Sequence, residues 1–449
     1  MSKTNVLDTA TVQRRDLMRG GLGIAGALAT GAALSRPALA AEAPLGNYPA
    51  GTTGPSIFVG LCTPLTGTYA AAGLDERKGF ELAISHLNSG HELFRKISPL
   101  TKTGVLGKKV EFDVADSQAK PNVAVQAQSR FISEKKAIMI AGCVSSAVAV
   151  ATNKLAQREH VIYLPLVSGS NDTTGKDCVR YSFRACHYAY TAAAAIAPEL
   201  IKAFGKGKKA AYLTPDYTYG HSVTGSVQEF LKPAGWTTIT DQVCPLGAPD
   251  YSSFLLNIAN SGADVLINVN FGNDAVGSIK QAKQFGILDK MKLVMPYMSP
   301  FLSKEVGADL MQGVYGTTEF WWTLGDKNPI AKMFVDTFNA KYGYKPEWDA
   351  HAAYLQVALW ADAVEHAKTF YPGDVIASYE SGRTMQTGLG PVKWRAADHQ
   401  LIRPVVVTRG KKPSAMKSPD DYFDIVALVP GEGLMQAPDA FGCKLGSVT

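Results

Sequence analysis

The stretch AIMIAGCVSSAVAVATNKLAQREHVIYLP, residues 137–165, contains the repeating unit of the fold. Residues 137–143 form a short apolar run that predicts a strand, residues 146–160 have a helical pattern, and residues 161–165 predict a second strand. Two strands joined through a helix run parallel, because the crossover returns the chain to the same edge of the sheet. The stretch therefore predicts a parallel sheet with helices packed on it.

The same alternation extends in both directions along the chain. Before this stretch, strands are expected at 56–62 and 108–116 and helices at 73–88 and 121–136. A second series starts near residue 208, with strands expected at 208–216, 237–245, 263–271 and 292–298 and helices at 220–235, 251–262 and 274–286. Two series of similar length predict an α/β protein with two similar doubly wound parallel-sheet lobes. Such lobes bind a ligand in a crevice at the carboxyl ends of their strands.

Composition agrees with a folded chain of several domains. Of the 449 residues, 46% are hydrophobic and 19% are charged, which excludes a disordered protein. The net charge is +6, with no run of basic residues, so we expect no nucleic-acid partner.

The first 40 residues have the pattern of an export signal. Arg14 and Arg15 precede a stretch rich in Gly and Ala, residues 20–34, which is too short and too rich in glycine to span a bilayer stably. The sequence Ala38-Leu39-Ala40 fits a signal-peptidase site. We expect a twin-arginine signal peptide that is cleaved near Ala40 and a mature protein in the periplasm, with its net charge lowered to +3.

Catalytic and metal-binding patterns are not recognisable. The sequence GCVSSA, residues 142–147, lacks the G-x-S-x-G pattern of a hydrolase elbow, and none of the eight histidines lies in an H-E-x-x-H motif. None of the six cysteines forms a C-x-x-C pair. We therefore expect neither an enzyme nor a metal site, and no cofactor.

Hydroxyl-bearing and aromatic residues follow the predicted strands. They lie in LCTPLTGTYAAAG (61–73), GCVSSA (142–147), LPLVSGSN (164–171), LTPDYTYG (213–220) and VNFGND (269–274). The start of the helix after Ser145 offers free N–H groups and a positive dipole end, which suit a carboxylate or a small amide.

These segments, in this order, resemble the periplasmic ligand-binding proteins of ABC transporters of the branched-chain amino acid type. The similarity runs from about Ile57 to Trp394 and includes TPLTGTYAAAGLDERKGFELAISHLN, YSFRA and GADVLINVNFGNDAVGSIKQAKQFG. It implies a type I fold, in which two lobes joined by three crossing strands close on a ligand. We expect lobe 1 at residues 55–184 plus 315–392, and lobe 2 with the C-terminal tail at residues 185–314 plus 393–449.

The resemblance also implies the ligand-binding residues. Ser145 with the adjacent Ser146, the backbone of Leu166 and the hydroxyl of Ser168 would hold a carboxylate, and Tyr219 would line the other lobe. Each serine has a plainer interpretation, because a serine on such a turn also caps a helix.

Two acidic positions of the family are lost in this chain. Tyr297 stands where the family places a Glu near the ligand ammonium, and Ala189 or Tyr190 stands at a second acidic position. A buried ammonium without a partner is costly, so we expect a carboxylate or amide ligand that lacks an ammonium group. Aromatic walls are expected from Tyr69, Tyr188, Tyr190, Tyr219, Phe271 and Tyr297. Asp216 or Asp274 would restore an amino acid site if either reached the ligand.

The disulfide pattern departs from that of some relatives, whose bridge cannot form here because its first position is Ser117. Cys178 precedes the first crossover and Cys443 closes a long tail, so we expect a disulfide between them that pins the tail there, which the periplasm permits. Cys62 and Cys143 end strands that would be neighbours, so they are expected to lie close together.

The sequence thus predicts a monomeric periplasmic receptor that delivers a small molecule to an ABC permease in the inner membrane. Two alternatives stay open at this point, a sensory receptor with the same clamshell and an ordinary amino acid binder.

Overall fold

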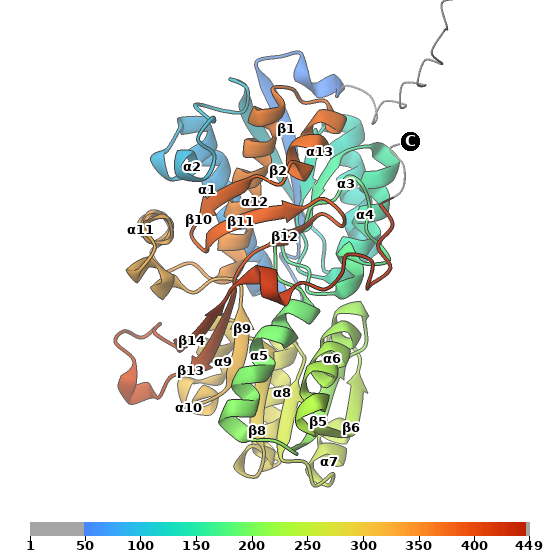
Figure 1. Cartoon of the computed structure of the whole chain (residues 1–449), viewed down its shortest axis with the longest axis vertical. Coiled ribbons are helices and arrows are strands. Elements are labelled where there is room, and N and C mark those ends of the chain that lie inside the picture. Colours follow the sequence, from blue (N-terminus) through green and yellow to red (C-terminus); the bar gives the residue numbers. More distant parts are fainter. Residues whose placement is uncertain (1–48, 446–449) are drawn as a thin grey trace, which may run out of the picture. The chain divides into compact units, whose positions relative to one another are not determined.

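The computed structural model describes residues 49–445. The expected signal peptide and its cleavage site lie outside the described residues. The described chain forms two α/β lobes, each built on its own sheet (Figure 1).

Lobe 1 contains a four-stranded parallel sheet of order β2-β1-β3-β4. Its strands are β1 (Ser56–Thr63), β2 (Lys109–Asp116), β3 (Met139–Ala141) and β4 (Ile162–Leu164). Its helices are α1 (Ala70–Ser89), α2 (Glu92–Ile97), α3 (Pro121–Lys135), α4 (Ser146–Glu159), α11 (Pro329–Tyr342), α12 (Trp348–Ala367) and α13 (Pro372–Glu380). Helix α1 packs along α12, and α3 packs along α4. The pairs bury the apolar strands between them, as the continuous hydrophobic runs of the strands predict.

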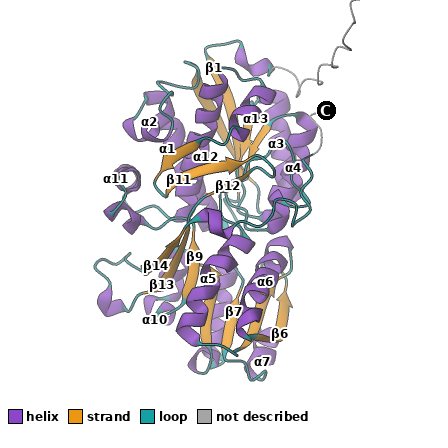
Figure 2. Cartoon of the chain, viewed as in Figure 1, coloured by secondary structure: helices purple, strands orange, loops and turns teal. Residues whose placement is uncertain are grey.

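Lobe 2 contains a seven-stranded sheet of order β14-β13-β9-β8-β7-β5-β6. Its strands are β5 (Lys209–Pro215), β6 (Thr237–Cys244), β7 (Val265–Asn268), β8 (Lys292–Tyr297), β9 (Tyr315–Thr318), β13 (Val405–Gly410) and β14 (Phe423–Val429), and only the last two join antiparallel. Its helices are α5 (Ala189–Phe204), α6 (Thr218–Leu231), α7 (Ser252–Ala259), α8 (Gly272–Gln284), α9 (Pro300–Val306) and α10 (Ala308–Met311). Figure 2 shows these helices around the sheet.

Strand β5 shows why the helices cover both faces of the second sheet. Tyr212 belongs to the apolar cluster that holds Ile196 of α5 and Val223 of α6. The next residue, Leu213, belongs to a separate cluster with helices α7 and α8. Successive side chains of a strand point to opposite faces, so an unbroken apolar run buries both.

The lobe boundaries differ from those expected from the sequence. Strand β9 pairs with β8 and β13, so residues 315–318 lie in lobe 2 and not in lobe 1. Strands β11 (Gly390–Arg395) and β12 (Gln400–Ile402) join β10 (Thr384–Thr387) in a three-stranded antiparallel sheet that packs on α2 and α13 of lobe 1. Residues 393–402 therefore lie in lobe 1 and not in lobe 2, because strand partners distant in the chain decide their place.

The chain crosses between the lobes three times, near Arg184–Tyr188, Glu319–Trp322 and Arg403–Pro404. Arg184 and Gln400 form a parallel bridge between the first and third crossings. The expected disulfide between Cys178 and Cys443 is present and joins the C-terminal tail to lobe 1, with 5.5 Å between the Cα atoms. Cys62 and Cys143 are buried in one small apolar cluster, and neither forms a disulfide.

None of the helices within residues 49–445 combines the length and the apolar character that a bilayer crossing requires. In the same range, no three His, Cys, Asp or Glu side chains are grouped as metal ligands.

Candidate functional site

A pocket lies between the lobes at the carboxyl ends of their strands, as the sequence predicted. About 320 Å³ of space there is not filled by atoms, solvent at the mouth included, and the cavity volume itself is only about 20 Å³. We call it the cleft pocket. Its lining residues are Val144, Val167, Ser168, Gly169, Cys186, His187, Tyr217, Tyr219, Phe271, Tyr297, Glu319 and Trp348. Both lobes and two crossings contribute, so the pocket exists only when the lobes meet.

The turn after β3 places the lobe 1 part of this wall. Gly142 has a φ of +118°, and a Cβ there would lie 2.2 Å from the backbone oxygen of Cys62. Only glycine fits so close to the neighbouring strand. Cys143 also has a positive φ, of +103°. This tight turn brings Val144 to the pocket and lets α4 begin at Ser146.

Contacts between the lobes hold the cleft closed around the pocket. The Thr68 hydroxyl donates to Asp274 at 2.8 Å, and the hydroxyls of Tyr69 and Tyr217 lie 2.7 Å apart. A third contact joins the hydroxyls of Ser170 and Thr218 at 2.7 Å. These contacts place Tyr69 behind the pocket wall, where its ring packs on Phe271.

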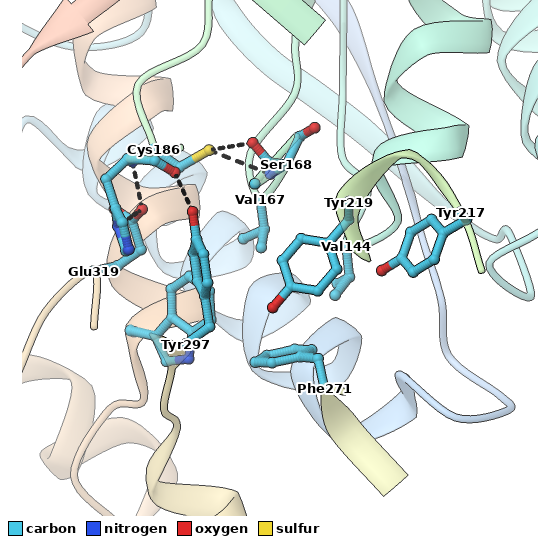
Figure 3. Close-up of a pocket in the computed structure, with 12 residues that line it drawn as sticks. Val144, Val167, Ser168, Cys186, Tyr217, Tyr219, Phe271, Tyr297 and Glu319 are labelled. Atoms are coloured by element: carbon cyan, nitrogen blue, oxygen red, sulfur yellow. Dashed lines mark hydrogen bonds and ion pairs between the residues drawn. The ribbon is translucent and has the colours of Figure 1, made fainter. Parts of the chain in front are cut away.

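Aromatic rings form most of the walls (Figure 3). The rings of Tyr219 and Tyr297 meet edge to face, with 5.4 Å between centroids. Phe271 meets Trp348 in the same way at 5.6 Å. Tyr297 stacks on the imidazole of His187 at 4.7 Å. The pocket therefore suits a small ligand with an apolar or aromatic body.

Several buried polar atoms at or beside the pocket have no hydrogen-bond partner among the described residues. They are the Tyr219 hydroxyl, the Trp348 indole nitrogen and the Ser145 hydroxyl. Burial raises the pKa of Tyr219 well above its usual value, with a further effect of Tyr217, so its hydroxyl keeps its proton. Unpaired buried donors are costly, and a ligand with acceptor atoms would satisfy them.

The serine cradle expected from the sequence is largely engaged within the protein. Ser168 lines the pocket, but its hydroxyl donates to Ser146 at 3.1 Å and lies 2.7 Å from the hydroxyl of Thr173. The Ser146 hydroxyl also accepts the N–H of Ser170. The backbone oxygen of Leu166 accepts from Gln356 at 2.9 Å. Ser146 and Leu166 thus shape the wall from behind and do not line it.

Glu319 is the one carboxylate that lines the cleft pocket. One oxygen accepts the backbone N–H of His187 at 2.6 Å, and the other pairs with the guanidinium of Arg403. Arg403 also donates to the backbone oxygen of Glu319 at 2.6 Å. Burial lowers the pKa of His187 well below its usual value, with smaller effects of Arg403 and Arg184, so its imidazole is neutral. The charge of Glu319 is therefore already neutralised by Arg403.

A second buried cation, Arg184, lies directly behind the Ser168 wall. It donates to the backbone oxygen of Ser168 at 2.9 Å and to the side-chain oxygen of Gln400 at 2.7 Å. Ser170 and Thr174 supply its other acceptors. All of these acceptors are neutral, so dipoles solvate the charge of Arg184. The carboxylate of Asp398 also acts on this charge, but its ion-pair partner is Arg395.

The remaining expected residues lie elsewhere. The ring of Tyr188 packs against the guanidinium of Arg184, and Tyr190 packs on Phe230 and Phe441. Asp216 is exposed beside His221. Asp274 is buried but accepts from Thr68 and from the N–H of Gly247. Neither aspartate lines the pocket, so neither restores an ammonium partner there.

Sequence reasoning placed Ser168, Tyr219, Phe271 and Tyr297 correctly in the pocket wall and missed its other residues. The most important omissions are Glu319, His187, Cys186 and Trp348. The first three lie on the crossings, and the fourth begins α12. The crossings must pass beside any cleft between two lobes, and that rule would have pointed to them.

The comparisons with known proteins agree with this geometry. Residues 56–415 match the family described as periplasmic binding protein. The Leu/Ile/Val-binding protein homolog 8 of Brucella abortus (strain 2308) is 26% identical over 336 residues, 72% of this chain and 79% of that protein.

Solved structures share the fold over most of the chain. A periplasmic binding protein from Burkholderia mallei has a TM-score of 0.78 at 25% identity, over 86% of this chain and 99% of that one. An ABC transporter solute-binding protein from R. palustris, solved in complex with benzoate, has a TM-score of 0.72 at 22% identity, over 87% of this chain and 100% of that one. The chain therefore belongs to the periplasmic binding protein family, the non-catalytic solute-binding proteins of ABC transporters.

Proposed function

We propose that this protein is the periplasmic receptor of an ABC importer for a small monocarboxylate without an ammonium group, aromatic or branched aliphatic. The observation that carries this proposal is the charge around the cleft pocket. Glu319 is paired with Arg403, and Arg184 has only neutral acceptors. The charged groups at the wall therefore carry an excess of one positive charge, which favours an anion.

The same charges disfavour an ammonium group. An amino acid needs a free acceptor for its ammonium, and the carboxylate of Glu319 is already engaged by Arg403 and His187. Tyr297, at the position where the resemblance implies an acidic residue, offers a hydroxyl that donates to the backbone oxygen of His187 at 3.3 Å. An ammonium group buried in the pocket would lose its hydrogen bonds to water, and the pocket would not provide enough free acceptors to replace them.

The lining narrows the ligand class further. The closed pocket has a cavity volume of only about 20 Å³, roughly the room for one water molecule, so a ligand would enter while the lobes are apart and displace the rings that line the pocket. Aromatic walls on several sides suit a single ring or a short branched chain. The R. palustris protein that was solved with benzoate shows that this fold accommodates such a ligand, although its low identity carries only the fold.

The test compares ligands that differ only in the ammonium group. Isothermal titration of the chain from residue 41 onward would use 4-methylpentanoate against leucine, which has the same carbon skeleton. Benzoate and benzamide would separate a charged from a neutral head group. We expect 4-methylpentanoate or benzoate to bind at least about tenfold tighter than leucine, the factor that 1.4 kcal/mol provides. If leucine bound more tightly than 4-methylpentanoate, the proposed ligand class would be refuted. If benzamide bound more tightly than benzoate, the ligand would be an amide and not a carboxylate.

The partner and the assembly belong to the same proposal. We infer a periplasmic monomer that is exported by the twin-arginine signal and that presents both lobes of its closed form to a permease. Light scattering after gel filtration should give one chain per particle. Cells in which the gene is deleted should no longer take up the carboxylate that the protein binds. If uptake stayed intact and the cells lost their behavioural response to this carboxylate, the sensory role would be favoured instead.

A further inference from the structure

A second and larger cavity lies beside the crossings. Its cavity volume is about 420 Å³, against about 20 Å³ in the cleft pocket. Its principal walls are Lys304, Trp321, Trp322, Tyr344, Lys345 and Tyr422. We call this cavity the hinge groove.

The walls of the hinge groove come from both lobes. Tyr344 and Lys345 lie on the loop between α11 and α12 of lobe 1. Lys304 lies on α9 of lobe 2, and Tyr422 precedes β14 of the same lobe. Trp321 and Trp322 lie on the second crossing. A molecule in the groove would therefore touch both lobes at once.

The surface of the groove is aromatic, with ammonium groups placed on the rings. The Lys345 nitrogen lies 3.5 Å from the centroid of the Trp322 ring. The Lys78 nitrogen lies 4.5 Å from the centroid of the Tyr344 ring. The Trp322 indole nitrogen is buried and has no acceptor among the described residues. Flat aromatic walls suit a planar ring system.

Positive charge dominates in the groove. Lys78, Lys304 and Lys345 line it, against the carboxylates of Asp420 and Glu347. Asp420 is engaged by Lys345 at 3.3 Å. Burial and then the neighbouring Asp75 raise the pKa of Glu347 to about 8, so this carboxyl is mostly protonated at neutral pH. Asp75, whose carboxylate accepts the Tyr344 hydroxyl at 2.9 Å, offsets a further positive charge. The three lysines still exceed the ionised carboxylates Asp420 and Asp75 by one charge, which favours an anion.

Two short segments line both cavities. On the second crossing, Glu319 faces the cleft pocket, whereas Trp321 and Trp322 face the groove. At the start of α12, Trp348 faces the pocket and Glu347 faces the groove. Across the lobes, the N–H of Phe301 in α9 donates to Glu347 at 3.2 Å. The two cavities are therefore connected through these two segments.

We propose that the hinge groove is a second ligand site, for a planar aromatic carboxylate or sulfonate of several rings, and that its occupation favours the closed arrangement of the lobes. A ligand that contacts both lobes binds best where both walls are present, so it shifts the population toward the closed form. This proposal does not depend on the chemistry of the cleft ligand.

The test uses pyrene-1-sulfonate as the probe and 1-pyrenemethanol as its neutral counterpart, by titration calorimetry and fluorescence anisotropy. The groove variant Lys304→Gln/Lys345→Gln has as its matched control Lys109→Gln/Lys202→Gln, two lysines on exposed surfaces in ion pairs. We expect one sulfonate per chain and about fivefold weaker binding in the groove variant, as two partly exposed charges would give. The control variant should bind like the parent chain. Trp322→Leu, which removes one aromatic wall of the groove, should also weaken binding.

Three results would overturn the proposed site: no saturable binding, equal binding of the neutral probe, or an equal loss in the control variant. Competitive displacement by benzoate would assign the probe to the cleft pocket and would also overturn it. Closure of the two lobes is measured separately, by small-angle scattering of the protein without any ligand in the cleft pocket. A radius of gyration that falls when pyrene-1-sulfonate is added supports the closing role, and an unchanged radius refutes it. Failure of benzoate to bind would count against the proposed function alone.

Discussion

The carboxylate of Glu319 lies against the guanidinium of Arg403, and both side chains are buried where the second and third crossings meet. This pair joins two strands that are far apart in the sequence and forms one wall of the cleft pocket. Because Arg403 neutralises Glu319, the one carboxylate among the pocket-lining residues, this carboxylate is not free to bind an ammonium group. Because both charges are buried, the loss of either one should also lower the stability of the fold.

Replacement of Glu319 by Gln should destabilise the protein by about 3 kcal/mol, because Arg403 would remain buried without a counter-charge. Urea unfolding measures the change. Asp216→Asn is the control, because Asp216 pairs with His221 on the exposed surface and should cost less than about 1 kcal/mol. Equal stability of the two variants would show that the buried pair contributes nothing.

Gly169→Ala should weaken cleft-ligand binding at least about tenfold, which corresponds to 1.4 kcal/mol. A Cβ at residue 169 would lie 2.9 Å from the Tyr219 ring and 3.1 Å from the Tyr297 ring, so one ring must move into the pocket. Gly225→Ala on α6 is the control, because nothing lies within 4 Å of its Cβ position. That variant should bind normally and gain helix stability. Calorimetric titration with benzoate or 4-methylpentanoate measures the affinity of both variants. Normal binding by Gly169→Ala would show that a Cβ at residue 169 does not push a tyrosine ring into the pocket.

Tyr219→Phe should reduce affinity for a carboxylate about tenfold, because a hydrogen bond to a charged group contributes about 1.5 kcal/mol or more. The unfolding temperature should stay equal or rise, since the hydroxyl has no partner in the protein. Tyr379→Phe is a matched control, because its hydroxyl is also buried without a partner but lies outside the cleft pocket. An affinity loss in both variants would mean that the Tyr219 hydroxyl does not contact the ligand.

The bond between Cys178 and Cys443 closes a loop across 265 residues. Cys443→Ser should lower stability by about 2–5 kcal/mol. Four of the six cysteines are free, so the denatured chain should titrate four thiols before reduction and six after it. Two further thiols before reduction would show that the bond is absent from the purified protein.

Glu347 should make stability depend on pH. Its pKa is raised from 4.5 to about 8, so its stabilising effect is complete below about pH 4.5. As the pH rises further, the unfolded chain loses this proton while the folded chain keeps it, and stability falls until about pH 8. Asp75, with a pKa raised to about 6, adds to the fall at lower pH.

Thermal unfolding of Glu347→Gln between about pH 6.5 and pH 8.5 isolates this effect, because the variant cannot titrate there. The parent chain should lose a few degrees more than the variant over that range. Glu432→Gln, at an exposed position, should follow the parent chain. Parallel curves for the parent and Glu347→Gln would contradict the raised pKa.

The sequence by itself determined the α/β class, the two lobes and the strands and helices of the two parallel series. These features depend on short apolar runs and helical periodicity, which are local. The pairing of Cys178 with Cys443 was predicted from their places beside the first crossing and at the end of the tail, and the structure confirms it. Among the described helices, α2, α5, α9, α10 and α13 were not predicted. Four of these are short, and α5 contains Pro198, which argues against an uninterrupted helix.

Only the tertiary structure decided which sheet each of β9, β11 and β12 joins and which residues line the pocket. A short strand shows its own pattern in the sequence but not the identity of its partner. Ser146 and Ser168 look alike in the sequence, yet only Ser168 lines the pocket. The pairing of Glu319 with Arg403 is equally invisible there, because it depends on two crossings that meet across 84 positions of the chain. The physical reason is that burial and charge at the cleft arise from contacts between segments whose local patterns are independent of one another.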